Sequence, residues 1–366
     1  RDMDVLKNIA KVSRALRAST GRFSQRESSR GGFQYLGCSD SRLLVGGCLG
    51  EFPCKQRLAV EGKMHCDQFQ SYNQHSAGIW VEFATDSKFV DLEVIIDAGI
   101  IPDNMSVNAA LGIDVYVREG RTFRWMSVHA PKSLSSPYIR TRLSFADSHE
   151  RHVVRVYMPL YARVRRLHVG VPDTASFFAP DFTADGKPVL FYGSSITQGC
   201  AAARPALCVP SLVGRCLNRE TINLGFSSSA FGETEIARAI GELDLGGVVI
   251  EYDHNADLAH LRDTHETFVK TIRECNTTVP IVLLSRASAG LSCSREEAAE
   301  RLGVIEKTYR LLVSEGDTHI SLLSGDEVIP EDMRDCSFAD DRHPNQKGLD
   351  LIAEALVTAL EGMLHD

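Results

Sequence analysis

At 366 residues, the chain is longer than a single hydrophobic core usually grows, which favours two domains over one. Hydrophobic residues make up 43% and charged residues 24% of it, and no apolar run approaches the ~18 residues of a membrane span, so the composition favours a soluble protein without a membrane partner. The net charge of −8 gives no general electrostatic reason to bind nucleic acid.

The first 35 residues suggest a weak amphipathic helix followed by a polar tail. They are charged and lack the apolar centre of a secretory signal, which favours a cytoplasmic location. An exported form stays an alternative, because the first residue is not Met and the ten cysteines are an even number. The cysteine spacings match no paired C-x-x-C metal site. We therefore expect buried thiols, with a Cys200–Cys208 or N-terminal disulfide as the alternative.

Residues 36–172 alternate apolar and polar side chains in short segments separated by turn residues, as in "AGIWVEFAT", "KFVDLEVIID", "GIDVYVREG", "TFRWMSVHA", "RHVVRVYMP" and "VRRLHVGV". A period of two with regular turns is typical of an antiparallel β-sandwich or jelly roll. Residues 173–187 are rich in Pro, Asp and Thr and predict a linker.

From residue 188 to 366 the pattern changes. Apolar runs, "PVLFYG", "TINLGF", "GGVVIEY", "PIVLLS" and "HISLLSG", alternate with longer stretches of helical period. Alternation of this kind predicts a mostly parallel sheet covered by helices on both faces. The last stretch, "NQKGLDLIAEALVTALEGML", carries one apolar stripe and should pack on the sheet.

Chemically useful residues follow the predicted strands, where the loops of a parallel sheet converge. They are Ser194 and Ser195 after the first strand, Ser227 to Ser229 after the second, Asp253, His254 and Asn255 after the third, Arg286 after the fourth, and Asp340, Asp341 and His343 before the last helix. A serine, an imidazole, a carboxylate and N–H donors are what acyl transfer requires. Taken singly, each has an alternative: a serine at such a turn can be a helix cap, and "DRHPN" can be a turn with an N-cap.

These runs resemble the conserved blocks of the SGNH (GDSL-like) hydrolases. "YGSSITQG" is similar to the first block, usually Gly-Asp-Ser-x-Thr with the nucleophile third, which implies Ser195 as nucleophile and Ser194 in place of the usual Asp. "VVIEYDHNAD" resembles the third block, whose oxyanion-hole asparagine corresponds to Asn255. "DDRHP" resembles the Asp-x-x-His block, which implies Asp340 as the orienting acid and His343 as the base.

The second block departs from the family. Where the family has "NLGFSG", this chain has "NLGFSS", so Ser228 stands at the glycine whose backbone N–H serves the oxyanion hole together with that of Ser195. Gly225 is a structural glycine three residues earlier. In the β-rich half, "GIDVY" resembles the Gly-x-Asp-Leu-Tyr signature of a domain that precedes SGNH domains in a bacterial group.

Three further residues are candidates for substrate contact, each with a simpler alternative. Asp114, from "GIDVY", can be a turn or strand-edge carboxylate. Arg286 can be a solvated loop arginine that never meets substrate. His254, beside Asn255, can satisfy backbone carbonyls in a tight loop.

The resemblance implies a flavodoxin-like three-layer α/β/α hydrolase domain after the β-sandwich. The expected activity is that of a serine esterase with an acyl-enzyme intermediate, no metal and no cofactor. The expected substrate is a small molecule or carbohydrate ester, with O-acetyl groups on a carbohydrate as the leading choice. The alternatives are an acyltransferase or thioesterase with the same triad, and a non-catalytic binding protein on the same fold.

Overall fold

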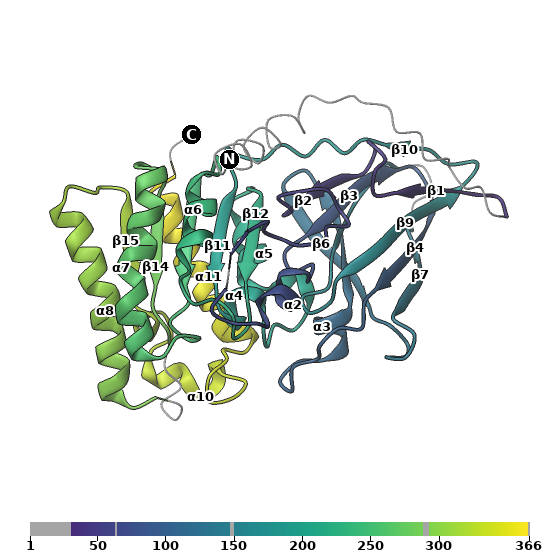
Figure 1. Ribbon diagram of the computed structural model, residues 1–366. Helices are drawn as coiled ribbons and strands as arrows, with labels where there is room; N and C mark the ends of the chain where they lie inside the picture. Colours follow the sequence, from purple (N-terminus) through teal and green to yellow (C-terminus); the bar gives the residue numbers. More distant parts are fainter. Residues whose placement is uncertain (1–30, 63, 147–149, 288–292, 365–366) are drawn as a thin grey trace.

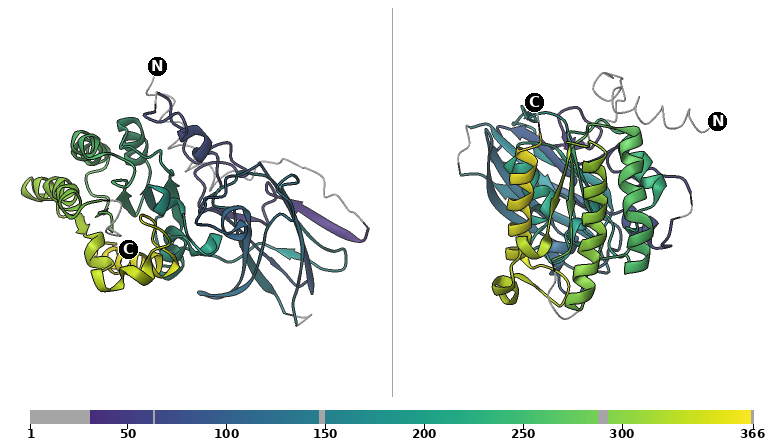
Figure 2. Two further views of the ribbon diagram at one scale, coloured as in Figure 1. Left: turned by 90° about the horizontal axis from the view of Figure 1, so that it is seen from below. Right: turned by 90° about the vertical axis from the view of Figure 1, so that its left-hand side faces the viewer.

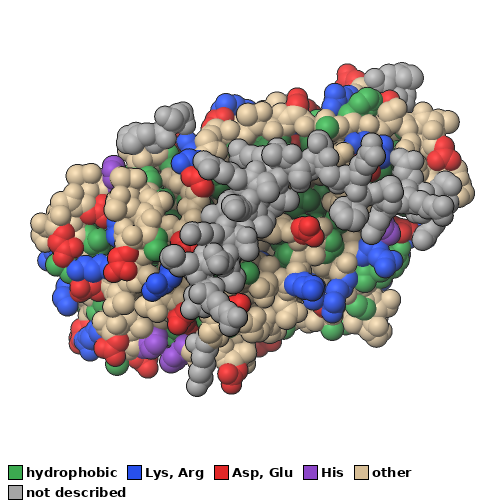
Figure 3. Space-filling model, turned by 45° about the horizontal axis from the view of Figure 1, so that its top comes forward, with side chains coloured by type: hydrophobic (Ala, Val, Ile, Leu, Met, Phe, Trp, Pro, Cys, Tyr) green, Lys and Arg blue, Asp and Glu red, His purple; other side chains and the backbone are tan. Residues whose placement is uncertain are grey.

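The computed structural model describes residues 31–62, 64–146, 150–287 and 293–364, so the helix expected near the N-terminus lies outside the described residues. The chain forms a β-rich part and an α/β part that lie side by side (Figure 1). Within the described ranges, no helix has the length and apolarity that crossing a membrane requires. On the face in Figure 3, acidic and basic side chains intermingle over the described surface.

Two antiparallel sheets build the β-rich part. One has the order β1 (Phe33–Gly37), β9 (Val164–Pro172), β4 (Phe89–Ile96) and β7 (Tyr138–Ser144). The other has the order β10 (Phe177–Phe178), β3 (Trp80–Thr85), β8 (His152–Tyr157), β5 (Ile113–Glu119) and β6 (Thr122–His129), with β2 (Leu44–Gly46) also paired to β3. Alternate side chains of β4, among them Val90, Leu92 and Val94, are fully buried in the core. The predicted antiparallel β-rich domain is therefore confirmed.

The segment predicted as a linker is more ordered than expected. Within residues 173–187, β10 pairs with the end of β3. The carboxylate of Asp185 accepts from both Arg121, in the β-rich part, and Asn218, in the α/β part. The segment between the two parts therefore contains a short strand and is hydrogen-bonded to both of them.

Five parallel strands form the central sheet of the α/β part, in the order β12 (Thr221–Gly225), β11 (Val189–Gly193), β13 (Gly247–Glu251), β14 (Ile281–Leu284) and β15 (Ile320–Leu323). On one face lie α5 (Val209–Cys216) and α11 (Gln346–Glu361), in the same core cluster as Phe191. On the other lie α6 (Thr234–Gly241), α7 (Leu258–Cys275) and α8 (Arg295–Ser314), with Leu190 and Tyr192. Figure 2 shows these helices on the two sides of the sheet, which confirms the three-layer prediction.

Short helices fill the connections. They are α2 (Phe69–Asn73), α3 (Val107–Leu111), α4 (Ser195–Gln198), η1 (Pro205–Leu207), α9 (Gly325–Val328), η2 (Glu331–Met333) and α10 (Arg334–Ser337). Of these, α4 carries Ser195, the expected nucleophile, and α10 precedes the loop of His343.

The two parts meet through aromatic and arginine side chains. The guanidinium of Arg215, on α5, lies over the rings of Tyr116 and Tyr157 of the β-rich part, at 5.2 and 5.4 Å from the ring centroids. In the opposite direction, the buried Arg57 donates to the carbonyl oxygens of Asn223 and Gly225 at the end of β12. Each part thus supplies an arginine that contacts aromatic rings or backbone carbonyls of the other part.

Candidate active site

The nucleophile turn joins β11 to α4. A Cβ on Gly193 would collide with Thr197 and with the carbonyl of Glu251, so the turn needs a glycine here. Ser194 is the N-cap of α4, because its Oγ accepts the N–H of Ile196 at 3.1 Å. Ser195 is therefore the first helical residue, with its hydroxyl at the carboxyl end of the central sheet.

A hydrogen-bonded chain runs from Ser195 to His343 and Asp340. Ser195 Oγ lies 3.0 Å from His343 Nε2, and His343 Nδ1 lies 2.9 Å from Asp340 Oδ2. The carboxylate also accepts the backbone N–H groups of Arg342 at 2.8 Å and His343 at 2.6 Å. The structure thus brings together the three residues expected to form the triad, and it is Asp340 that faces the imidazole.

The pKa values of Asp340 and His343 are shifted in opposite directions. Burial acts to raise the pKa of Asp340, but the backbone N–H and imidazole of His343 and the backbone N–H of Arg342 outweigh it and lower that pKa to about 2. Burial acts to lower the pKa of His343, but Cys200 and Asp340 outweigh it and raise that pKa to about 9. Asp340 therefore stays ionised at neutral pH and favours a proton on the imidazole.

Ser228 lies in a tight turn with a left-handed backbone. Its φ is 52°, which favours glycine, and the turn is closed by the N–H of Ser229 donating to the carbonyl of Phe226 at 3.0 Å. Asn255 Nδ2 donates to the same carbonyl at 3.0 Å. Two of the three residues expected in the oxyanion hole, Ser228 and Asn255, are thus linked through the carbonyl of Phe226. The positive φ also gives a conformational reason for the glycine that the family has at this position.

The family comparisons cover both parts of the chain. Residues 186–361 match the GDSL-like Lipase/Acylhydrolase family, and residues 56–177 match the N-terminus of SGNH-hydro-type esterases. Residues 186–361 thus form an SGNH (GDSL-like) hydrolase domain. It is an esterase or acylhydrolase of that type, which sets aside the non-catalytic alternative. No curated protein matches the chain.

Solved structures with this fold span nearly the whole chain. A protein of Bacteroides ovatus reported as a GDSL-like lipase has 21% identity and a TM-score of 0.77, over 91% of this chain and 98% of that one. Salicylyl-acyltransferase SsfX3 from a tetracycline biosynthetic pathway has 17% identity and a TM-score of 0.73, over 92% and 99%. A family two carbohydrate esterase from Cellvibrio japonicus has 14% identity and a TM-score of 0.58, over 91% and 98%.

Asp114 is fully buried in this hydrolase and its carboxylate is engaged. Oδ1 accepts the indole N–H of Trp125 at 3.0 Å, and Oδ2 accepts the backbone N–H of Ala206 at 3.2 Å. Ala206 lies in η1, the short helix that follows α4 in the chain. Asp114 lies in β5, which has a partner strand on each side, and its carboxylate joins η1 to the β-rich domain; this is a structural role, although not the turn or strand-edge position that the simpler alternative expected.

Arg286 and His254 lie near the triad but are not aligned with it. The backbone N–H of Arg286 donates to Asp253 Oδ2 at 3.0 Å, and both Arg286 and His254 are half-buried. Burial, followed by the charge of Arg286, lowers the pKa of His254 well below its usual value. His254 is therefore neutral at neutral pH. Arg286 and His254 both remain candidates for substrate contact.

Sequence reasoning missed two polar residues that hold the nucleophile turn. Glu251, the last residue of β13, accepts from the hydroxyls of Ser194 and Thr197. Gln198 Oε1 accepts the N–H of Ser227 at 3.0 Å, and its Nε2 donates to the carbonyl of Leu160 at 3.0 Å. Glu251 could have been predicted from the sequence, because an acidic residue at the end of an apolar, buried strand needs hydrogen-bond partners.

Glu251, Asp253 and His254 are also the cluster most suited to a metal ion among the described residues, because their ligand atoms lie within 4.8 Å of one another. The oxygens of Glu251 already accept from Ser194 and Thr197, however. Burial and then the neighbouring Asp253 raise the pKa of Glu251 to about 8, which favours a proton on it at neutral pH. The cluster is therefore better suited to holding the nucleophile turn through hydrogen bonds than to binding a cation.

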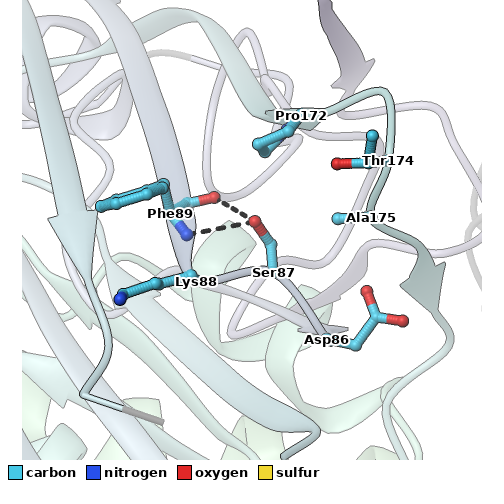
Figure 4. Close-up of a pocket in the computed structure, with 7 residues that line it drawn as sticks. All are labelled: Asp86, Ser87, Lys88, Phe89, Pro172, Thr174 and Ala175. Atoms are coloured by element: carbon cyan, nitrogen blue, oxygen red, sulfur yellow. Dashed lines mark hydrogen bonds between the residues drawn. The ribbon is translucent and has the colours of Figure 1, made fainter. Parts of the chain in front are cut away.

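A surface pocket in the β-rich domain lies apart from this chemistry. It is lined by Asp86, Ser87, Lys88, Phe89, Pro172, Thr174 and Ala175 (Figure 4). The Ser87 hydroxyl is bound to the backbone of Phe89, donating to its carbonyl and accepting its N–H. Because no triad residue lines it, the pocket is not part of the candidate site.

The cysteines form no bridge. All ten lie in described parts of the chain and are free thiols, so the alternative of a Cys200–Cys208 disulfide is not realised. Cys200 and Cys208 are both buried, as expected for apolar fillers.

Proposed function

We propose that this hydrolase is a serine esterase in which Ser195 is the nucleophile, His343 the general base and Asp340 the acid that orients it. The observation that supports this most directly is the distance of 3.0 Å between Ser195 Oγ and His343 Nε2. The bond between His343 Nδ1 and Asp340 places the proton of the neutral imidazole on Nδ1. Nε2 is then free to accept the proton of the serine.

The reaction follows from these positions. Ser195 Oγ attacks the ester carbonyl while His343 Nε2 takes its proton, and negative charge develops on the carbonyl oxygen. The backbone N–H groups of Ser195 and Ser228 and the second amide hydrogen of Asn255 receive that charge. Collapse expels the alcohol with the proton from His343 and leaves an acyl group on Ser195. Water then attacks this acyl-enzyme with His343 as base, releasing the acid.

The proposed substrate is a small ester, with O-acetyl groups on a carbohydrate as the first choice. Support comes from the fold shared with the carbohydrate esterase of Cellvibrio japonicus, whose chain aligns over 98% of its length. Fold alone does not determine the substrate, so this step needs a direct assay.

An acyltransferase is the second candidate. The fold is more similar to the salicylyl-acyltransferase, with a TM-score of 0.73, than to that carbohydrate esterase, with 0.58. The same triad would serve, with an alcohol replacing water in the second step. Product analysis with candidate alcohol acceptors separates the two, because a transferase forms a new ester and an esterase releases free acid.

The experiment is a hydrolysis panel of p-nitrophenyl esters from acetate to palmitate, together with acetylated sugars. We expect the wild type to turn over short acyl esters and acetylated sugars, and Ser195→Ala to lose the activity by several orders of magnitude. Equal activity of wild type and Ser195→Ala would contradict the proposed nucleophile. Turnover of only long-chain esters would contradict the proposed substrate.

A further inference from the structure

The carboxylate of Asp340 is also bound from the β-rich domain. Asn104 lies in the connection between β4 and α3, and its side-chain Nδ2 donates to Asp340 Oδ2 at 2.7 Å. This is the oxygen that lies 2.9 Å from His343 Nδ1. A residue of the first domain therefore contacts the acid of the proposed triad at the atom that orients the base.

The amide of Asn104 is held in one orientation. Cys200 Sγ donates to Asn104 Oδ1 at 3.2 Å, so the oxygen end of the amide faces the thiol and the nitrogen end faces Asp340. Cys200 follows the nucleophile helix, and its backbone N–H donates to the carbonyl of Ser195 at 2.8 Å. The contacts close a ring from Ser195 through His343, Asp340, Asn104 and Cys200 back to Ser195.

The ring matters because Asp340 lies on a surface loop. Its side chain is 35% exposed, so water competes with the protein donors for its oxygens. A hydrogen bond from an amide to an ionised carboxylate is stronger than one between neutral groups. Asn104 binds Oδ2, whereas the backbone N–H groups of Arg342 and His343 bind Oδ1, so donors from both domains hold the two oxygens of the carboxylate.

We propose that Asn104 is a positioning residue, through which the β-rich domain holds Asp340 in the orientation that the general base needs. The inference rests on the proposed function, since it assigns Asn104 a role only through Asp340 and His343. It also gives the β-rich domain an indirect part in the chemistry, because a residue of that domain holds the acid of the triad in position. Cys200 acts indirectly, because its thiol orients the side-chain amide of Asn104.

The first test is Asn104→Ala, assayed with p-nitrophenyl acetate. We expect kcat to fall by roughly tenfold or more, because a hydrogen bond to a charged group is lost, while KM and the melting temperature stay close to those of wild type. Asn108→Ala, at an exposed asparagine on nearby α3, is the matched control and should behave as wild type. Cys200→Ser keeps a donor toward Asn104 and should retain more activity than Cys200→Ala.

The deciding test is a double-mutant cycle. If Asn104 acts through Asp340, Asn104→Ala should cost nothing further in an Asp340→Asn background. Should Asn104→Ala destabilise the fold, the isosteric Asn104→Asp takes its place; it removes the donor and puts a like charge against Asp340, so kcat at pH 8 should fall at least as far.

Three results would overturn the inference: unchanged kcat in the Asn104 variants, a change confined to KM, which would indicate a substrate contact, or full additivity with Asp340→Asn. The rate at which a fluorophosphonate labels Ser195 provides a second readout that needs no substrate, and Asn104→Ala should slow it. Labelling of wild type at Ser195 with unaffected Asn104 variants would reject the role of Asn104 alone. Wild type that is neither labelled nor active would reject the proposed function itself.

Discussion

The hydroxyl of Ser194 lies 2.9 Å from both carboxylate oxygens of Glu251, and it also accepts the N–H of Ile196. The hydroxyl therefore donates to the adjacent strand β13 and accepts from its own helix α4. The next residue, Ser195, has its hydroxyl against His343 instead. Two adjacent serines therefore have separate tasks: the first builds the turn and the second faces the base. Where the family usually has an aspartate at position 194, this chain has the carboxyl group of Glu251 on the neighbouring strand.

Ser194→Ala should lower stability more than activity. The substitution removes a helix N-cap and leaves the buried Glu251 short of a donor, which should reduce the free energy of unfolding by about 1–2 kcal/mol. We expect kcat to fall by less than roughly tenfold, since no reacting atom is removed. Urea denaturation and steady-state kinetics measure the two effects. A loss of kcat as large as that of Ser195→Ala would mean that Ser194 takes part in the chemistry.

The activity should rise with pH well above the usual titration of histidine. A raised pKa means that His343 keeps its proton to higher pH, and a protonated imidazole cannot accept the proton of Ser195. The groups around it are Asp340, Cys200, the neutral His254 and Arg342. With the pKa of His343 raised to about 9, kcat/KM of the free enzyme should increase across pH 7–9. An NMR titration of the His343 ring checks the cause directly, and a midpoint near 6.5 would contradict it.

Asp340 and Asp341 should differ sharply when changed in the same way. Asp340→Asn removes the charge that holds His343 in its tautomer and should lower kcat by about 10²–10⁴-fold. Asp341→Asn, at an exposed neighbour, is the matched control and should keep most of the activity. Steady-state kinetics on both variants suffices. The reverse order of effects would place the acid at Asp341.

Ser228→Gly should retain activity and stabilise the protein. The φ of 52° at Ser228 strains a residue with a Cβ, so glycine should raise the free energy of unfolding by up to about 1 kcal/mol. The backbone N–H stays in place for the oxyanion. A proline here would be a poor probe, because its φ is fixed near −65° and the turn would distort. A drop in kcat of Ser228→Gly by roughly tenfold or more would show that the serine hydroxyl itself contributes.

Local patterns predicted the architecture well. The runs "KFVDLEVIID" and "GIDVYVREG" alternate with period two and became β4 and β5, because one face of each strand is buried. All five apolar runs of the α/β half became its parallel strands. Strand β7 was missed because its two buried residues, Ile139 and Leu143, are four positions apart among exposed arginines. The pairing of β10 was missed because two residues carry no period.

The parts of the site that escaped prediction depend on contacts between distant segments. The triad residues could be named because short motifs carry them. Asn104 lies 236 positions from Asp340 in the sequence, and the residues around it predict only a turn. The role of Cys200 could not be predicted for the same reason, because the sequence does not distinguish a buried cysteine that only fills space from one that orients an amide. Such contacts exist only once the two domains have packed together.

The central claim, that Ser195 is the nucleophile, is tested most directly by locating a covalent label. Wild-type protein is treated with a fluorophosphonate and digested, and the modified residue is identified by fragment-ion mass spectrometry, with Ser195→Ala and His343→Ala treated in parallel. The account predicts one label on Ser195, none in Ser195→Ala, and much slower labelling in His343→Ala. A label on Ser194, or equal labelling of Ser195 without His343, would contradict it.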